Sequence, residues 1–227
     1  TTTTSDPVVA FYPKKDAVLA KLPKSVSVGG LVKLSSLTAV YFVGGDGTRH
    51  PFANEASYFS WFEDFSSVKT VSQETMSALP MGKTVRIRPG TWMIKIQSDP
   101  KVYAVEPGGK LRWVKTEAVA KSLFGDTWNK QIVDVEPTYF TSYSFTSPIE
   151  GEDVHPVASL VKDAGGSMYY IAEDGTMRKL SDGNSRKANG FQTKFARTMR
   201  AGDLIKTAGG VIAGLEDALY IYQDIGR

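Results

Sequence analysis

A pattern of a lysine, a tyrosine and a turn glycine returns three times and limits the possible folds of this chain more than any other feature. In the first two copies the tyrosine follows the lysine by eight residues, and the glycine follows the tyrosine by six. The third copy is one residue shorter between the lysine and the tyrosine. The three copies are Lys33, Tyr41 and Gly47; Lys95, Tyr103 and Gly109; and Lys162, Tyr169 and Gly175. Such self-similarity indicates repeated supersecondary units.

The residues around each glycine predict the same local structure, a β-hairpin followed by a short helix. Runs rich in β-branched and aromatic residues flank the glycines, as in strands joined by a tight turn. In the first copy Asp46-Gly47 predicts a type I′ turn, because both residue types tolerate positive φ. Each copy then has a residue that can cap a helix: Asn54, Thr116 and Asp182. A linking segment with Val68 and Val71 follows, and a further short helix is predicted between Ser72 and Pro80.

These units predict a mainly β fold with short helices, in which three to four hairpin-plus-helix units form a propeller-like arrangement. A fourth, degenerate copy is predicted between Ala201 and Tyr222, and an N-terminal strand would close the ring. The predicted parts are an extension with one strand (1–24), repeats one and two (25–146), and repeats three and four (147–227); all could also form one domain. The alternative is two β-rich lobes divided near Gly151, because the acidic stretch 147–156 with its two prolines indicates a boundary or an exposed loop.

Composition excludes several classes of protein. A formal net charge of +3 over 227 residues is too small to predict a nucleic-acid groove. Cysteine is absent, which excludes a disulfide framework and thiolate chemistry. No stretch approaches the length of an apolar membrane span, so none is predicted. The threonine-rich start TTTTSDP is typical of linkers in exported surface proteins and predicts an extracellular or cell-surface location.

No residue pattern predicts a catalytic centre. His50 takes the position that Arg112 and Arg178 hold in the other copies, so we expect a cationic group stacked on a cross-strand tyrosine there. His155 lies in the acidic stretch 147–156 and is expected at the surface, since no further metal ligands surround it. Four carboxylates near turn glycines could bind calcium, but turn and cap roles are favoured because no recognised calcium loop is present: Asp46, Glu173, Asp174 and Asp182. We therefore predict no catalytic residue, metal or cofactor, and no enzyme.

The sequence from Gly29 to Tyr143 carries motifs that extend beyond simple patterning. They are GGLVK, AVYFV and DGTRHPFANEASYFSWFEDFSSVKTVS, followed by RPGTWMIKI and DPKVYAVEPGGKLRWV. This half of the chain resembles a repeat module of large predicted cell-surface, S-layer-like proteins of ultrasmall bacteria, and the resemblance fades beyond Tyr143. It implies export and a role in the cell envelope. It brings no catalytic residues with it.

Three functions remain open at this point. The first is a non-enzymatic structural protein that assembles with copies of itself into a surface layer or filament, using the N-terminal strand Val8, Val9, Ala10, Phe11 and Tyr12. The second is an adhesin-like module that binds carbohydrate or a host surface through exposed aromatic rings, with four candidates: Trp61, Trp92, Trp113 and Trp128. A hydrolase is the least favoured. Trp61 also belongs to a helical stripe with Tyr58, Phe62 and Phe65, which predicts either a core-facing surface or a sugar-stacking platform.

Overall fold

The computed structural model describes residues 22–200, 203 and 208–216. The predicted strand from Val8 to Tyr12 and the predicted strand from Ala218 to Tyr222 lie outside the described residues. Backbone contacts divide the chain into two compact units, and the division falls between Arg86 and Ile87. It does not fall near Gly151, because residues on both sides of that position belong to the second unit.

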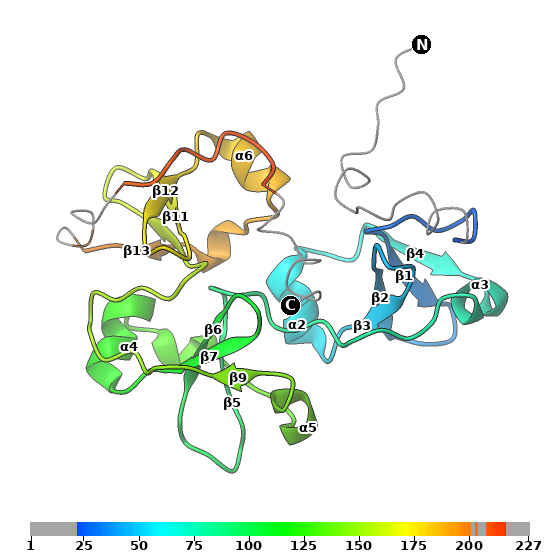
Figure 1. Cartoon of the computed structure of the whole chain (residues 1–227), viewed down its shortest axis with the longest axis horizontal. Coiled ribbons are helices and arrows are strands. Elements are labelled where there is room, and N and C mark those ends of the chain that lie inside the picture. Colours follow the sequence, from blue (N-terminus) through cyan, green and yellow to red (C-terminus); the bar gives the residue numbers. More distant parts are fainter. Residues whose placement is uncertain (1–21, 201–202, 204–207, 217–227) are drawn as a thin grey trace. The chain divides into compact units, whose positions relative to one another are not determined.

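The first unit contains a four-stranded sheet in the order β3-β2-β1-β4. Its elements are β1 (Leu31–Leu34), β2 (Val40–Val43), β3 (Arg49–Pro51), α2 (Glu55–Trp61), β4 (Val68–Val71) and α3 (Gln73–Ser77). Strand β1 is antiparallel to β2 and parallel to β4. Because parallel neighbours need a crossover, α2 carries the chain from β3 to the other edge of the sheet (Figure 1).

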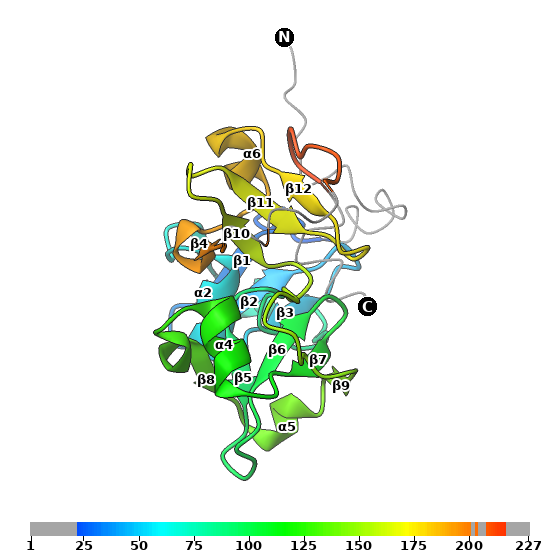
Figure 2. The same ribbon diagram turned by 90° about the vertical axis from the view of Figure 1, so that its left-hand side faces the viewer.

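The second unit begins with a five-stranded sheet in the order β8-β5-β6-β7-β9. Its elements are β5 (Met93–Lys95), β6 (Tyr103–Glu106), β7 (Lys110–Trp113), α4 (Glu117–Phe124), the 3-10 helix η2 (Trp128–Gln131), β8 (Ile132–Asp134), α5 (Pro137–Phe140) and β9 (Ser144–Phe145). Helix α4 covers one face of this sheet (Figure 2), where Val119, Ala120 and Leu123 pack against Met93 and Ala104. This cluster is the core of the sheet.

The same unit continues into a four-stranded sheet in the order β12-β11-β10-β13. Its elements are β10 (Leu160–Lys162), β11 (Met168–Ile171), β12 (Met177–Lys179), α6 (Gly183–Ala188), the 3-10 helix η3 (Thr193–Phe195) and β13 (Arg197–Thr198). The fold is therefore mainly β with short helices, as predicted. It contains three separate sheets, and none of them closes on itself within the described residues.

All three sheets share one strand order and one register. If the strands are counted in chain order within each sheet, the third, second, first and fourth strands are neighbours. In each sheet the tyrosine of the sequence pattern faces the first strand, in the pairs Val32 with Tyr41, Ile94 with Tyr103 and Val161 with Tyr169. The segments predicted only as links, including Val68–Val71, are the fourth strands.

After the fourth strand, the chain returns along the third strand in every sheet. Parallel bridges mark this return: Arg49 with Met81, Phe52 with Val85, Val114 with Ile149, Met177 with Ala208 and Leu180 with Ile212. In the second sheet the returning segment also forms strand β9 beside β7. Ala208 and Ile212 were assigned from sequence to a fourth copy, but the structure places them in the third sheet.

The turn of the first hairpin differs from the predicted type I′ geometry. Gly47 has φ of 79°, whereas Asp46 is outside the left-handed region that this turn requires, since Ala158 is the one non-glycine residue with positive φ among those described. The Gly44 N–H donates to the Thr48 carbonyl at 2.8 Å, which encloses three loop residues. Asp46 and Gly47 are the last two of these three residues, and of the pair only the glycine takes positive φ.

The predicted helix caps are confirmed. The side-chain oxygen of Asn54 accepts from the Ser57 N–H at 2.8 Å, Thr116 from Val119 at 3.2 Å, and Asp182 from Ser185 at 2.8 Å. Ser72 also caps α3 as expected, with its side chain accepting from the Thr75 N–H. These bonds satisfy backbone groups that a first helical turn leaves free, and they fix where each helix begins.

Buried Arg197 joins the two sheets of the second unit. Its guanidinium donates to the Gly90 carbonyl at 3.0 Å, the Thr91 carbonyl at 2.5 Å and the Ser159 hydroxyl at 3.1 Å. It also lies 4.2 Å from the ring centroid of Phe124. Burial lowers the pKa of Arg197 to about 9, so the side chain stays protonated at neutral pH. The contacts compensate a cation that would otherwise be costly inside the protein.

Candidate ligand groove

Trp61 is not exposed, so the prediction that it offers a binding surface is wrong. Its side chain is 7% exposed, and its indole N–H donates to the Arg86 carbonyl at 2.9 Å. Tyr58 on the same helix face is also buried. The core-facing interpretation therefore describes these two residues. Phe65 is half exposed, but it lies beyond the end of α2 and stacks on the Tyr58 ring with centroids 4.5 Å apart.

Trp92 is half-buried and serves packing in the second unit. Its ring meets the Phe195 ring edge-on, with centroids 4.9 Å apart and an angle of 87° between the ring planes. Because Phe195 belongs to η3, this contact adds to the junction that Arg197 makes between the two sheets. Trp92 does not line the groove that the remaining two tryptophans share.

Trp113 and Trp128 line a common groove at one end of the second sheet. Its cavity volume is about 260 Å³, and both indole rings are half-buried in its walls. The floor is apolar, with Val114 and Ala120 nearly inaccessible to solvent. The polar or charged lining residues are Lys101, Lys115, Thr116 and Glu117. An apolar groove with a few polar groups at its rim is the usual form of a small-molecule site.

Local structure explains why the two tryptophans converge. Trp113 is the last residue of β7, and the backbone next to it is held by a bond from the Val114 N–H to the Val102 carbonyl at 2.9 Å. Trp128 begins η2, which follows α4 after a reversal at Gly125 with φ of 81°. Gly125 also accepts from the Trp128 N–H at 3.0 Å. The end of the hairpin and the end of the helix are thereby brought together.

Lys101 enters the groove from the loop before β6. Its ammonium nitrogen lies 5.3 Å from the ring centroid of Trp113, within the range of a cation–π contact. The Asp99 carboxylate accepts from the Lys101 backbone N–H at 2.9 Å and fixes the loop. Lys101 was not predicted from the sequence as a site residue. It stands two residues before Tyr103, and Tyr103 pairs with Trp113 across the hairpin. That spacing could have indicated that Lys101 lies near Trp113.

The predicted stacking of His50, Arg112 and Arg178 on cross-strand tyrosines is wrong. Each of these side chains instead donates to a backbone carbonyl of the returning segment. The bonds are His50 Nδ1 to Lys83 at 2.7 Å, Arg112 Nε to Ser147 at 3.0 Å and Arg178 Nε to Gly210 at 3.0 Å. The stacking occurs one residue earlier in the first sheet, where Arg49 lies 5.1 Å from the Tyr41 ring centroid.

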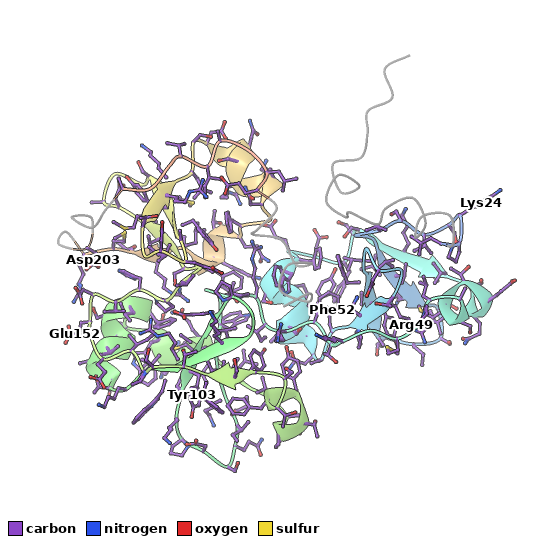
Figure 3. The ribbon with its side chains drawn as sticks, viewed as in Figure 1. Lys24, Arg49, Phe52, Tyr103, Glu152 and Asp203 are labelled. Carbon is purple, nitrogen blue, oxygen red and sulfur yellow. The ribbon has the colours of Figure 1, made fainter. Side chains whose placement is uncertain are left out.

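His155 also departs from its predicted exposed position. Its side chain is 6% exposed, and its Nε2 lies 3.2 Å from the Asp203 carboxylate. Arg200 contacts both Asp203 and Glu152, so the acidic stretch 147–156 is tied to Arg200 and Asp203; Figure 3 labels Glu152 and Asp203. Ile149 in that stretch is fully buried. The stretch is thus anchored at both ends and is not simply an exposed loop.

The carboxylates considered for calcium have structural contacts. The Asp174 carboxylate accepts from the Thr176 N–H at 2.9 Å and from the Thr176 hydroxyl at 2.7 Å, and these bonds lower the pKa of Asp174. Asp46 makes the same contacts with Thr48. Asp182 caps α6, and Glu173 lies in the same turn as Asp174. Among the described residues, no group of three or more metal-ligating side chains is assembled.

Comparisons with known proteins identify no family for this chain. No family model matches it, and no curated protein sequence matches it. Among solved structures it is similar to a chain of the "Structure of the periplasmic assembly from the ESX-5 inner membrane complex, C1 model", at 11% identity and a TM-score of 0.23, over 89% of this chain and 64% of that one. A second is the "Structure of an intact ESX-5 inner membrane complex, Composite C3 model", at 11% identity and a TM-score of 0.22, over 82% and 58%.

The chain thus spans less than two thirds of the length of these structural neighbours. TM-scores of 0.23 and 0.22 are too low to carry an argument about fold or function. Within the described ranges, no helix has the length and apolar character needed to cross a membrane.

Proposed function

We propose that this chain is a non-enzymatic carbohydrate-binding module of an exported surface protein, and that the groove between Trp113 and Trp128 is its binding site. One observation carries the proposal: two half-buried indole rings, from separate elements, form the walls of a single groove of about 260 Å³. Pockets for drug-sized ligands begin at roughly 300 Å³, so this volume suits one ring of a longer ligand.

The chemistry of the lining fits a sugar ring. Indole rings offer broad apolar faces, and the C–H-rich face of a pyranose stacks on such surfaces. The hydroxyl of Thr116 and the carboxylate of Glu117 can form hydrogen bonds with sugar hydroxyl groups at the rim. A binding role is favoured over glycoside hydrolysis because hydrolysis generally uses two carboxylates, and Glu117 is the one carboxylate among the groove's lining residues.

An array of neutral and acidic oligosaccharides, probed with the intact chain, tests the proposal. We expect binding to a set of related glycans that is lost in both Trp113→Ala and Trp128→Ala. The matched control is Phe145→Ala, which removes an aromatic side chain that is 62% exposed and does not line the groove. Absence of binding to every glycan, or equal loss in the control, would reject this function.

The export and surface location belong to the same proposal. They are supported by the threonine-rich start and by the resemblance of residues 29–143 to a module of cell-surface proteins. Detection of the native protein on intact cells with an antibody, before and after removal of surface proteins by protease, would test the location. A signal found only after lysis would contradict it.

Self-assembly is the second candidate, and the open edge of the first sheet favours it. Strand β4 is an edge strand, and no other described strand pairs with its outer side. An edge of this kind can accept a strand from another molecule. We propose the run from Val8 to Tyr12 of a second copy as that strand. Sedimentation of the full chain beside a version that starts at Ser25 would test this, and a full chain that stays monomeric at high concentration would reject it.

A propeller-like arrangement of the units is likewise a proposal, supported by the strand order that all three sheets share. In a closed ring the N-terminal strand would pair near Ala218–Tyr222. Because the chain has no cysteine, the variant Ala10→Cys with Ile221→Cys would carry a unique pair of thiols. An intramolecular disulfide under mild oxidation supports closure, and its absence argues for an open arrangement.

A further inference from the structure

Within the part of the chain that the structure describes, the charges around the groove divide into compensated pairs and one cation, Lys101, that has no acidic partner. Lys115 lies 2.7 Å from the Glu150 carboxylate, and Glu117 lies 2.8 Å from the Lys121 ammonium. Among the described residues no carboxylate lies within ion-pair distance of the Lys101 ammonium, which lies over the Trp113 ring. The groove therefore presents a net positive charge through Lys101.

We infer that the groove selects sugars that carry a carboxylate, with Lys101 as the residue that binds this carboxylate. The inference rests on the proposed carbohydrate-binding function and names the ligand class as hexuronic acids. A uronic acid stacked on Trp113 would bring its carboxylate to the side of the indole where the ammonium already lies. A charge-assisted hydrogen bond to a carboxylate is stronger than the contact of an exposed ammonium with a ring.

The position of Lys101 suits this role. The bond from its backbone N–H to Asp99 holds the loop, so the side chain starts from a defined point on the rim. The side chain itself is exposed and flexible enough to move from the face of the indole to its edge. A neutral sugar would displace the ammonium from the ring without offering a charged partner. A cationic ligand would face the Lys101 ammonium and be repelled.

The test compares sugars that differ only in the carboxylate. Oligomers of mannuronic, galacturonic and glucuronic acid are measured by calorimetry beside the corresponding neutral oligomers of mannose, galactose and glucose, with the intact chain. For at least one pair we expect the acid to bind about tenfold more tightly, which corresponds to about 1.4 kcal/mol. Raising the salt concentration from about 0.1 M to about 1 M shortens the Debye length from about 10 Å to about 3 Å and should reduce that preference.

Variants assign the preference to Lys101. Lys101→Gln should bind the acid and its neutral counterpart with equal affinity, because the charge that favours the acid is gone. Lys101→Arg should keep the preference. The control is Lys130→Gln, which removes an exposed lysine from the same short helix as Trp128 but outside the groove lining, and it should bind like the natural chain. Thermal unfolding of each variant checks that it is folded.

The outcomes separate this inference from the function on which it rests. Equal binding of acidic and neutral sugars, lost in Trp113→Ala, overturns the inference and leaves carbohydrate binding in place. A preference for the acid that persists in Lys101→Gln overturns the role of Lys101. Failure of the chain to bind any glycan rejects both the inference and the proposed function.

Discussion

The ends of equivalent hairpins in the first and second sheets differ more in side-chain chemistry than in backbone. Tyr41 faces Pro51 in the first sheet, and Tyr103 faces Trp113 at the matching place in the second. The residue two positions before the tyrosine is Ala39 in one and Lys101 in the other. The same backbone position thus holds an uncharged alanine in the first sheet and a groove-lining lysine in the second. The shared sheet order supplies a scaffold, and two or three substitutions on it supply the site.

The largest difference in stability between the second and third sheets should appear when the ion pair beside each returning segment is removed. Arg112 and its partner Glu106 are almost buried, with side chains 18% and 8% exposed, whereas Arg178 and Glu216 are 24% and 29% exposed. Arg112→Met leaves a buried carboxylate without its cation and should lower the free energy of unfolding by about 3 kcal/mol. Arg178→Met should cost only about 1 kcal/mol.

Urea unfolding followed by tryptophan fluorescence measures both variants, since Trp92, Trp113 and Trp128 all belong to the second unit. The double variant Arg112→Met with Glu106→Leu should recover only the part of the loss that comes from the unpaired charge of Glu106. The bonds from Arg112 to the Ser147 and Pro148 carbonyls, and from the Val157 N–H to Glu106, stay lost. Equal costs for the two single variants would show that burial does not distinguish the two pairs.

Glycan binding should depend on the tryptophan side chain and not on the backbone position that the first and second sheets share. Trp113→Ala should weaken glycan binding by about 2 kcal/mol, or about 30-fold, as expected for an aromatic anchor at a binding site. Pro51→Trp places an indole at the matching position of the first sheet but adds no counterpart of Trp128 there. It should give no new binding. Calorimetry with the best glycan decides, and a gain in Pro51→Trp would mean that a single ring is sufficient.

The hairpins and their helices could be predicted because their determinants are local. Gly47 and the caps Asn54 and Thr116 act within a few residues of where they stand in the sequence. The pairing of β4 with β1 could not be predicted, because the short run Val68–Val71 does not indicate which strand it pairs with. The burial of Trp61 and the half-exposure of Trp128 depend on which helix face meets the core. The groove needs three separate segments between Pro100 and Trp128 to converge, and residue types alone do not encode that convergence.

Acid should weaken the second unit through Asp203. Burial raises the pKa of Asp203, but hydrogen bonds from Arg200 and His155 outweigh it and hold the pKa below its usual value. The stabilisation is therefore present above the unfolded pKa near 3.8 and is lost as pH falls through the lower folded value. Thermal unfolding from pH 7 to about pH 2 should show this loss, most of it below the unfolded pKa near 3.8. Asp203→Asn should remove that part of the pH dependence, and an unchanged profile would contradict the assignment.

The smallest expected effect on stability comes from removing the helix caps of α2 and α4. Asn54→Ala and Thr116→Ala each remove one bond to a first-turn N–H and should each cost about 1 kcal/mol in the free energy of unfolding. Thr116 also lines the groove, whereas Asn54 does not, so Thr116→Ala alone should reduce glycan affinity. Thr116→Ser keeps the hydroxyl and should restore both stability and affinity. Calorimetry and urea unfolding on the same three variants separate the two roles. If Thr116→Ala loses stability but binds glycans normally, its hydroxyl serves only the helix, and ligand contacts at the rim come from the charged residues beside it.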